Sequence, residues 1–228
     1  MSHPPQQSVY GDEARLEVRP LIPDGVTSAL DVGCGRGGFG RTLRDVLGEH
    51  ARIVGIDAVE ENVRQARVGH GFDEVIHGYF PDAITPPNER YDLVIFLDVL
   101  EHVLDPWNVL RAARNHLNDG GWVVAAIPSI QMWKVLRGLL KGRWDYTEMG
   151  TLDRTHVRFF TKATMIELFE GAGFEVDECR GVNSQKPRLR PVRGLINRRI
   201  LKDMKWLPTV LPDSQWLHFV VVGRMRRE

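Results

Sequence analysis

Short apolar runs alternate with amphipathic stretches along most of the chain. Buried strands of a parallel sheet are apolar throughout, whereas the helices that cover them are apolar on one face only. The run 91–97 is the most apolar, so we expect it at the centre of the sheet. The alternation predicts an α/β fold, an open and mainly parallel sheet with helices on both faces. We expect strands at 26–32, 52–57, 74–77, 91–97, 122–127, 174–179 and 217–222, helices at 39–47, 59–68, 106–117 and 162–171, and a turn at 118–121.

Two long segments, 129–160 and 181–213, interrupt this alternation. Insertions near the carboxyl ends of strands are where α/β folds build substrate pockets and lids. A chain of 228 residues with 43% hydrophobic content can bury one sizeable core. We therefore expect a single domain at 26–228 with both insertions forming a lid, preceded by an N-terminal extension at 1–25.

The stretch 29–40 joins an apolar strand to a glycine-dense turn and then to a helix. Glycine lets the backbone turn sharply and lets a ligand lie against main-chain amides, while the helix start points its unpaired N–H groups at the same space. Gly33, Gly35 and Gly38 also have the G-x-G-x-x-G spacing of dinucleotide-binding loops. The stretch is therefore a candidate cofactor loop.

Asp31 adds a carboxylate at the end of the strand, where it suits an ammonium group better than a pyrophosphate. The pattern Asp31-x-Gly33-x-Gly35-x-Gly37 resembles that of class I S-adenosylmethionine (SAM)-dependent methyltransferases, and the resemblance extends from about residue 26 to 178. It implies SAM as cofactor and a Rossmann-like sandwich whose seven-stranded sheet has an antiparallel last strand. A nicotinamide cofactor and a turn without a ligand are the alternatives.

Asp57 ends the second expected strand, where an acid can accept hydrogen bonds from both ribose hydroxyls or cap the following helix. The family usually has an acid near the adenine, but this chain has Tyr79 there, so we expect the backbone of Tyr79 and Phe80 to contact the base. The expected cofactor-binding residues are Asp31, Gly33, Cys34, Gly35, Asp57, Ala58, Tyr79, Phe80, Leu97 and Asp98.

The segment that follows strand 91–97 contains Asp98, Glu101 and His102 at the spacing D-x-x-E-H. It resembles the E-x-x-E-H arrangement of metal-assisted 2′-O-methyltransferases of small RNAs and of some quinone-biosynthesis O-methyltransferases. There, carboxylates and imidazole bind a divalent ion that lowers the pKa of the acceptor hydroxyl. The resemblance implies these three residues as metal ligands, with His156 as a fourth. Alternatively, Asp98 lines the methionine part of SAM, and Glu101 and His102 only start a helical turn.

The first insertion contains Asp153, Arg154, His156 and Arg158. It resembles a bacterial subgroup of methyltransferases associated with surface-polysaccharide assembly. A hydroxyl acceptor gains from a base with a pKa near neutrality, which makes His156 the first candidate for general base and Asp153 a candidate to orient it or to bind a sugar hydroxyl. His102 is the third catalytic candidate. Alternatively, Asp153, Arg154 and His156 form a network that fastens the insertion to the sheet.

Charge and cysteine content bear on partners and location. Thirty basic and thirty acidic side chains cancel, which does not favour nucleic acid, although nine Lys or Arg and one acid lie between Arg180 and Trp206. The amphipathic stretch 131–141 is basic, so it suits a membrane surface, a lipid-linked substrate or a lid on its own domain. Two cysteines and the lack of an apolar export segment favour the cytoplasm, with peripheral contact at the inner membrane face.

These observations favour a SAM-dependent O-methyltransferase of polysaccharide biosynthesis that acts on the hydroxyl of a sugar or glycan, either a small molecule or lipid-linked. The alternatives are a metal-dependent O-methyltransferase acting on a quinone precursor or another phenol, a nicotinamide oxidoreductase, and a SAM-binding module without catalysis.

Overall fold

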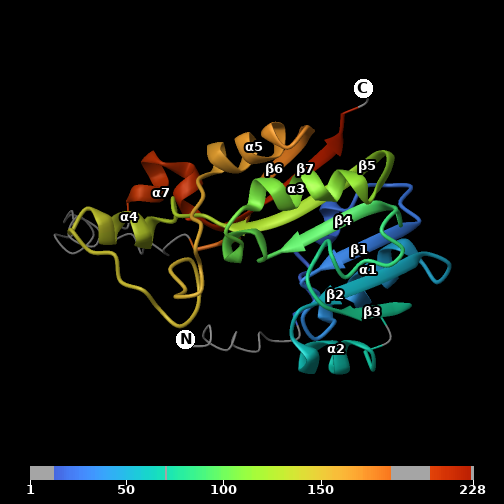
Figure 1. Cartoon of the computed structure of the whole chain (residues 1–228). Coiled ribbons are helices and arrows are strands. Elements are labelled where there is room, and N and C mark those ends of the chain that lie inside the picture. The colour runs from blue at the N-terminus through green and yellow to red at the C-terminus, as the bar shows by residue number, and fades with distance from the viewer. Residues whose placement is uncertain (1–12, 70, 186–205, 227–228) are drawn as a thin grey trace.

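The computed structural model describes residues 13–69, 71–185 and 206–226. A single twisted sheet runs through it, with helices on both faces (Figure 1). The strands are β1 (Ser28–Val32), β2 (Arg52–Asp57), β3 (Glu74–His77), β4 (Tyr91–Leu97), β5 (Leu117–Pro128), β6 (Phe174–Ser184) and β7 (Trp216–Met225). The α-helices are α1 (Gly38–Leu47), α2 (Glu60–Ala66), α3 (Pro106–Asn115), α4 (Trp133–Leu139), α5 (Lys162–Gly171) and α7 (Leu207–Val210), and the 3₁₀ turns are Arg19–Leu21, Leu100–His102 and Pro212–Gln215.

The strand order is β3-β2-β1-β4-β5-β7-β6. Every neighbouring pair is parallel except those that involve β7, which is antiparallel to both β5 and β6. This confirms the Rossmann-like α/β fold with an antiparallel last strand. The strand order reverses between β1 and β4, and a crevice at the carboxyl ends of such strands is where open α/β sheets bind ligands.

Two apolar layers hold the helices on the sheet. On one face, side chains of α3 and α5 such as Leu110 and Phe169 pack against Phe96 of β4. On the other face, Leu43 of α1 and Ile53 of β2 pack together with Val18, which precedes the first strand. All six side chains are fully buried. Truncating one of them to alanine typically costs about 2–5 kcal/mol, so both layers fix the edge that carries the loops.

Several boundaries differ from those expected. The turn expected at 118–121 is part of β5, because Gly120 adopts a left-handed φ of 72° and the register of β5 against β4 shifts there. β6 and β7 are longer than expected because they pair with each other from Phe174 to Ser184. The second insertion therefore leaves the sheet after 184 rather than at 181, and residues 186–205 of the basic segment lie outside the described residues.

The N-terminal extension is structured from residue 13 onward. Val18 and Leu21 are buried in the core, and the hydroxyl of Thr42 in α1 donates a hydrogen bond to the carbonyl oxygen of Ala14 at 2.6 Å. Residues 13–25 are therefore packed on the domain. The two ends of the first insertion meet, since Ile130 N–H donates to the carbonyl oxygen of Phe160 at 3.0 Å. In the described ranges, no helix combines the length and apolarity needed to cross a bilayer.

Gly40 illustrates how tightly α1 packs against the segment that precedes β3. A Cβ at Gly40 would lie 2.6 Å from the ring of Phe72, whereas a Cβ at Gly171 of α5 would meet nothing within 4 Å. Alanine gains about 1 kcal/mol over glycine inside a helix, but overpacking costs about 1–3 kcal/mol. We expect Gly40→Ala to lower the free energy of unfolding by about 1 kcal/mol and Gly171→Ala to raise it slightly, as measured by urea denaturation. A stabilised Gly40→Ala protein would show that Phe72 moves aside.

Candidate active site

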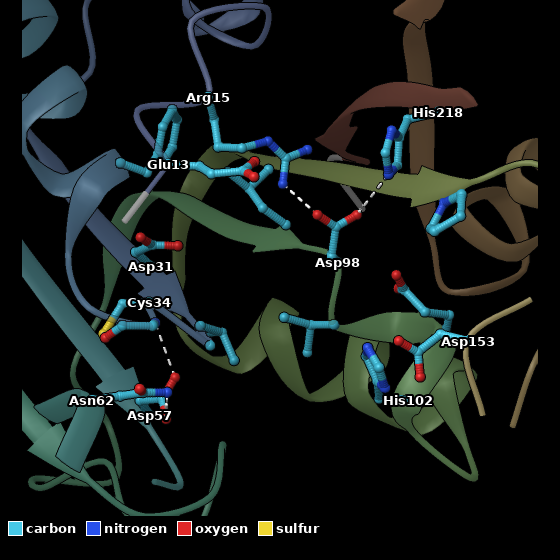
Figure 2. Close-up of a pocket in the computed structure, with 18 of the residues that line it drawn as sticks. Glu13, Arg15, Asp31, Cys34, Asp57, Asn62, Asp98, His102, Asp153 and His218 are labelled. Carbon is cyan, nitrogen blue, oxygen red and sulfur yellow. Dashed lines mark hydrogen bonds and ion pairs between the residues drawn. The ribbon is translucent and has the colours of Figure 1, made fainter. Parts of the chain in front are cut away.

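A cavity of about 890 Å³ opens at the carboxyl ends of β1, β2 and β4. This volume lies in the range of small-molecule sites. Its walls come from the N-terminal segment, the glycine loop, the end of β4, the first insertion and the start of β7. Figure 2 shows Asp98 near the middle, with Asp31 and Asp57 on one side and His102 and Asp153 on the other. The cavity thus has a β1–β2 end and an end beside the first insertion.

The glycine loop is held against the end of β2. Gly33, Gly35 and Gly37 have φ values of 72°, 54° and 93°, a region that other residues rarely adopt. The N–H groups of Gly33 and Cys34 both donate to the carbonyl oxygen of Ile56. The Cys34 side chain is buried beneath the loop, and burial, followed by the nearby Asp31 and Asp57 carboxyls, raises the pKa of its thiol. Cys34 therefore supports the loop as a small apolar group.

Asp57 connects the glycine loop to the start of α2. Its Oδ2 accepts from Gly35 N–H at 2.9 Å, and its Oδ1 accepts from Val59 N–H at 2.8 Å and from the Asn62 amide at 3.2 Å (Figure 2). The carboxyl also lines the cavity beside Ala58. The bond to Val59 N–H lies just before α2, which begins at Glu60, so it is not a hydrogen bond to the first turn of the helix. The contact of Asp57 with a ribose stays a prediction.

Asp31 lies at the end of β1 and is 2% exposed. Among the described residues, none donates a hydrogen bond to its carboxyl group, which lines the cavity. Burial, and then the charge of Asp57, raise the pKa of Asp31 to about 8, although Arg15 opposes the shift. A buried carboxyl without a partner is costly unless a cation pairs with it. Asp31 is therefore suited to bind a cationic group of a ligand.

Asp98 pairs with two side chains, Arg15 and His218, which the sequence did not indicate. The Arg15 guanidinium contacts Asp98 Oδ2 and lies 2.8 Å from Glu17, while His218 Nε2 lies 3.1 Å from Asp98 Oδ1 (Figure 2). Burial alone would raise the pKa of Asp98, but the hydrogen bond and charge of His218, together with Arg15, lower it to about 2. Arg15 and Asp98 have positive φ values of 46° and 55°. Non-glycine residues in this region often occur at functional sites.

Glu101, His102 and His156 form a compact cluster at the other end of the cavity. One potential ligand atom from each lies within 4.8 Å of the others. His156 Nε2 is 4.0 Å from Glu101 Oε1, and the two imidazole rings pack edge to face with centroids 4.7 Å apart. The sequence placed Asp98 in this group, but the structure does not include it, because its carboxylate pairs with Arg15 and His218.

Backbone contacts bring the cluster together and orient it. The N–H groups of Val157 and Arg158 both donate to the carbonyl oxygen of Glu101, which anchors the first insertion beside β4. His156 Nδ1 lies 3.1 Å from the carbonyl oxygen of Thr151, and His102 Nδ1 lies 3.3 Å from that of Thr155. A carbonyl at Nδ1 selects the tautomer with a proton there, which leaves Nε2 as a lone-pair donor.

The chemistry of the cluster fits a divalent metal ion. Glu101 is 1% exposed, and neither of its carboxyl oxygens has a hydrogen-bond partner among the described residues. Burial, followed by the charge of Asp98, raises the pKa of Glu101, and burial lowers the pKa of His102 and His156, which favours their neutral forms. One carboxylate and two imidazoles suit Mn²⁺, Fe²⁺ or Zn²⁺, and a bound cation would stabilise the Glu101 carboxylate.

Asp153 shapes the loop before His156. Its Oδ1 accepts hydrogen bonds from the backbone N–H and the hydroxyl of Thr155 at 2.8 and 2.7 Å. His156 Nδ1 lies against the Thr151 carbonyl oxygen rather than against Asp153, and the expectation that Asp153 orients His156 stays a prediction. The side chain is buried against the cavity and remains a candidate for contact with an acceptor.

The remaining expected contacts lie along the cavity wall. Tyr79, Phe80 and Leu97 all line it. Tyr79 is 76% exposed, whereas Phe80 packs edge to face on Phe96 and His116 with centroids 5.8 and 5.4 Å away. Phe80 therefore belongs partly to the core, and a role of its backbone in binding adenine stays a prediction.

Sequence comparisons point to one family. A family model described as a methyltransferase domain matches residues 13–179. The ubiquinone biosynthesis O-methyltransferase of Ruegeria pomeroyi is 30% identical over 159 residues, which cover 67% of this chain and 61% of that protein. The enzyme of the same name from Hydrogenovibrio crunogenus is 28% identical over 159 residues, with 68% of this chain and 64% of that protein covered. The chain thus spans less than two thirds of the length of these relatives.

Solved structures share the fold at low sequence identity. A SAM-dependent methyltransferase from Archaeoglobus fulgidus superimposes with a TM-score of 0.65 at 16% identity, covering 92% of this chain and 91% of the other. A SAM-dependent methyltransferase from Aquifex aeolicus gives a TM-score of 0.58 at 15% identity, with 98% and 94% covered.

Proposed function

The chain belongs to the family of class I SAM-dependent methyltransferase domains, and we propose that it methylates a phenolic hydroxyl held by a divalent metal ion. The observation that carries this proposal is the buried cluster of Glu101, His102 and His156 beside the cavity. The names of the relatives support an acceptor of the quinone-precursor type for them, and we extend that acceptor class to this chain.

The β1–β2 end of the cavity would hold SAM. Asp31 would pair with the ammonium group of the methionine part, which accounts for a buried carboxyl without a hydrogen-bond donor. Asp57 and the amides of the glycine loop would hold the ribose. The guanidinium of Arg15, which contacts Asp98, would also bind the carboxylate of the methionine part of SAM. SAM supplies an electrophilic methyl group when it is bound there.

Glu101 and the Nε2 atoms of His102 and His156 would hold the metal ion. When bound, a divalent ion supplies a Lewis acid that lowers the pKa of an acceptor hydroxyl. The carbonyl oxygens of Thr151 and Thr155 keep both imidazoles oriented, and the first insertion shields the cluster from water. The chain's contribution is alignment of the hydroxyl with the methyl group, and such positioning supplies a large part of catalysis in two-substrate reactions.

The lining near the cluster suits a flat apolar acceptor. The apolar side chains that line the cavity include Val103, which follows His102 directly, together with Val109, Met149 and Leu217. A sugar presents hydroxyls on all sides and would need more polar partners. The sugar or glycan acceptor expected from the sequence has no support from the relatives' names, and neither does a nicotinamide cofactor.

Chelation tests the proposal directly. We expect methyl transfer from labelled SAM to a catechol such as 3,4-dihydroxybenzoate, and we expect a loss of about 100-fold or more after chelation, reversed by Mn²⁺ or Zn²⁺. Calorimetric titration of the chelated protein with Mn²⁺ should show one site without any acceptor present. Full activity after exhaustive chelation would exclude the metal, and transfer to sugar nucleotides but not to catechols would restore the sugar acceptor.

A further inference from the structure

One end of the molecule carries an exposed apolar surface built from α4 and α7. Leu139 and Leu140 at the end of α4 are 45% and 66% exposed, and Trp206, Val210 and Leu211 around α7 are 38%, 60% and 50% exposed. We call these five residues the α4–α7 surface. Figure 1 shows both helices at the same end of the molecule, away from α2 and β3.

The other sides of these helices are anchored. Met132, Trp133 and Val135 of the α4 region pack with Leu207 of α7 in one buried cluster. The indole N–H of Trp133 donates to the carbonyl oxygen of Gln185 at 2.9 Å. The helices are therefore fixed on the domain, so the outward position of the leucines follows from packing.

Two lysines lie on or directly after α4, and Nζ of Lys134 lies over the ring of Trp133 at 5.9 Å from its centroid. Lys134 and Lys141 are exposed, and within the described part of the chain no carboxylate pairs with either of them. The nearby Asp145 already pairs with Arg143 at 2.7 Å. Two exposed positive charges thus lie on or directly after the helix that carries the exposed leucines, in a chain whose net charge is zero.

We propose that the α4–α7 surface docks on an anionic lipid membrane. Leucines and tryptophan next to lysines are the composition of interfacial helices, which place apolar side chains at the boundary between headgroups and acyl chains and basic ones against anionic headgroups. A protein partner is less favoured, since lysine is depleted at protein interfaces. The surface lies outside the cofactor and metal sites, so docking is independent of the proposed function.

Vesicle co-sedimentation tests this with the whole chain. We use vesicles of phosphatidylcholine alone and of phosphatidylcholine with phosphatidylglycerol, at low and high salt. The protein should bind the anionic vesicles more strongly, and salt should weaken the binding. Replacing Lys134 and Lys141 together by Gln should weaken it roughly 30-fold, and replacing Leu139 and Leu140 together by Asp should weaken it more than about tenfold.

Val68 provides the matched control, since it is 68% exposed and follows α2 at the opposite end. Val68→Asp should bind vesicles as the unchanged protein does, and all variants should bind S-adenosylhomocysteine normally, which shows that they are folded. Equal binding of neutral and anionic vesicles, or no effect of either double substitution, would overturn the proposal. A soluble dimer that the leucine substitutions dissociate, without vesicle binding, would also overturn it and identify the surface as a contact between two copies.

Discussion

Glu101→Gln is expected to abolish metal binding and to lower methyl transfer by about 100-fold or more, because the amide keeps the shape of the side chain but removes the anionic ligand. Replacing a residue that only orients a metal ligand already lowers metal affinity or activity by about 10–100-fold. Loss of a direct ligand should therefore lower them by more. The carboxyl has no hydrogen-bond partner in the described structure, so little stability depends on it. The thermal midpoint should change by no more than a few degrees.

The measurements are Mn²⁺ titration calorimetry, thermal unfolding and methyl transfer to a catechol. Glu167→Gln on the exposed face of α5 is the matched control and should behave like the unchanged protein. S-adenosylhomocysteine affinity should persist in Glu101→Gln, because the cluster lies at the other end of the cavity. A large fall in thermal midpoint together with activity would assign Glu101 a structural role instead.

Asp31→Asn is expected to weaken binding of S-adenosylhomocysteine by about 10–100-fold at pH 7.5, since a charge-assisted hydrogen bond contributes about 1.5–3 kcal/mol. The pKa of Asp31 is about 8 in the protein without ligand, so the carboxyl is largely neutral at lower pH. Binding an ammonium group favours the carboxylate. The affinity of the unchanged protein should therefore rise with pH between 5.5 and 7.5, by at most tenfold per unit.

The raised pKa of Asp31 affects the stability of the ligand-free protein in the opposite direction, so that this stability falls as pH rises. A carboxyl whose pKa is raised on folding favours the folded state most at low pH, and this stability is lost as pH rises toward about 8.

Calorimetric titration with S-adenosylhomocysteine at three pH values, with exposed Asp24→Asn as control, tests the binding prediction for Asp31→Asn. An unchanged pH dependence in Asp31→Asn would show that another group binds the ammonium.

Local patterns were sufficient for much of the fold. The strands 52–57, 74–77 and 91–97 and the helix 162–171 occur where the sequence predicts them. The strands 52–57 and 91–97 have apolar interiors, and Thr161 caps α5 by accepting from Thr164 N–H. The ends of β5, β6 and β7 could not be predicted in this way, because pairing with a distant strand sets their lengths.

The candidate site, like the fold, could be predicted from the sequence only in part. Asp31, Asp57, Glu101 and His102 follow strand ends, and the carboxyl ends of parallel strands meet at one edge, so the sequence alone determined that they would share a site. Its pattern also determined the family, through the glycine loop.

The tertiary structure decided which side chains face each other across that site. The carbonyl oxygen of Glu101 anchors the backbone of the first insertion and so brings His156 to the cluster. Asp98 pairs instead with Arg15 and His218, from opposite ends of the chain. Contacts between residues far apart in sequence depend on the packing of whole elements, and no local pattern of apolar and polar positions encodes them.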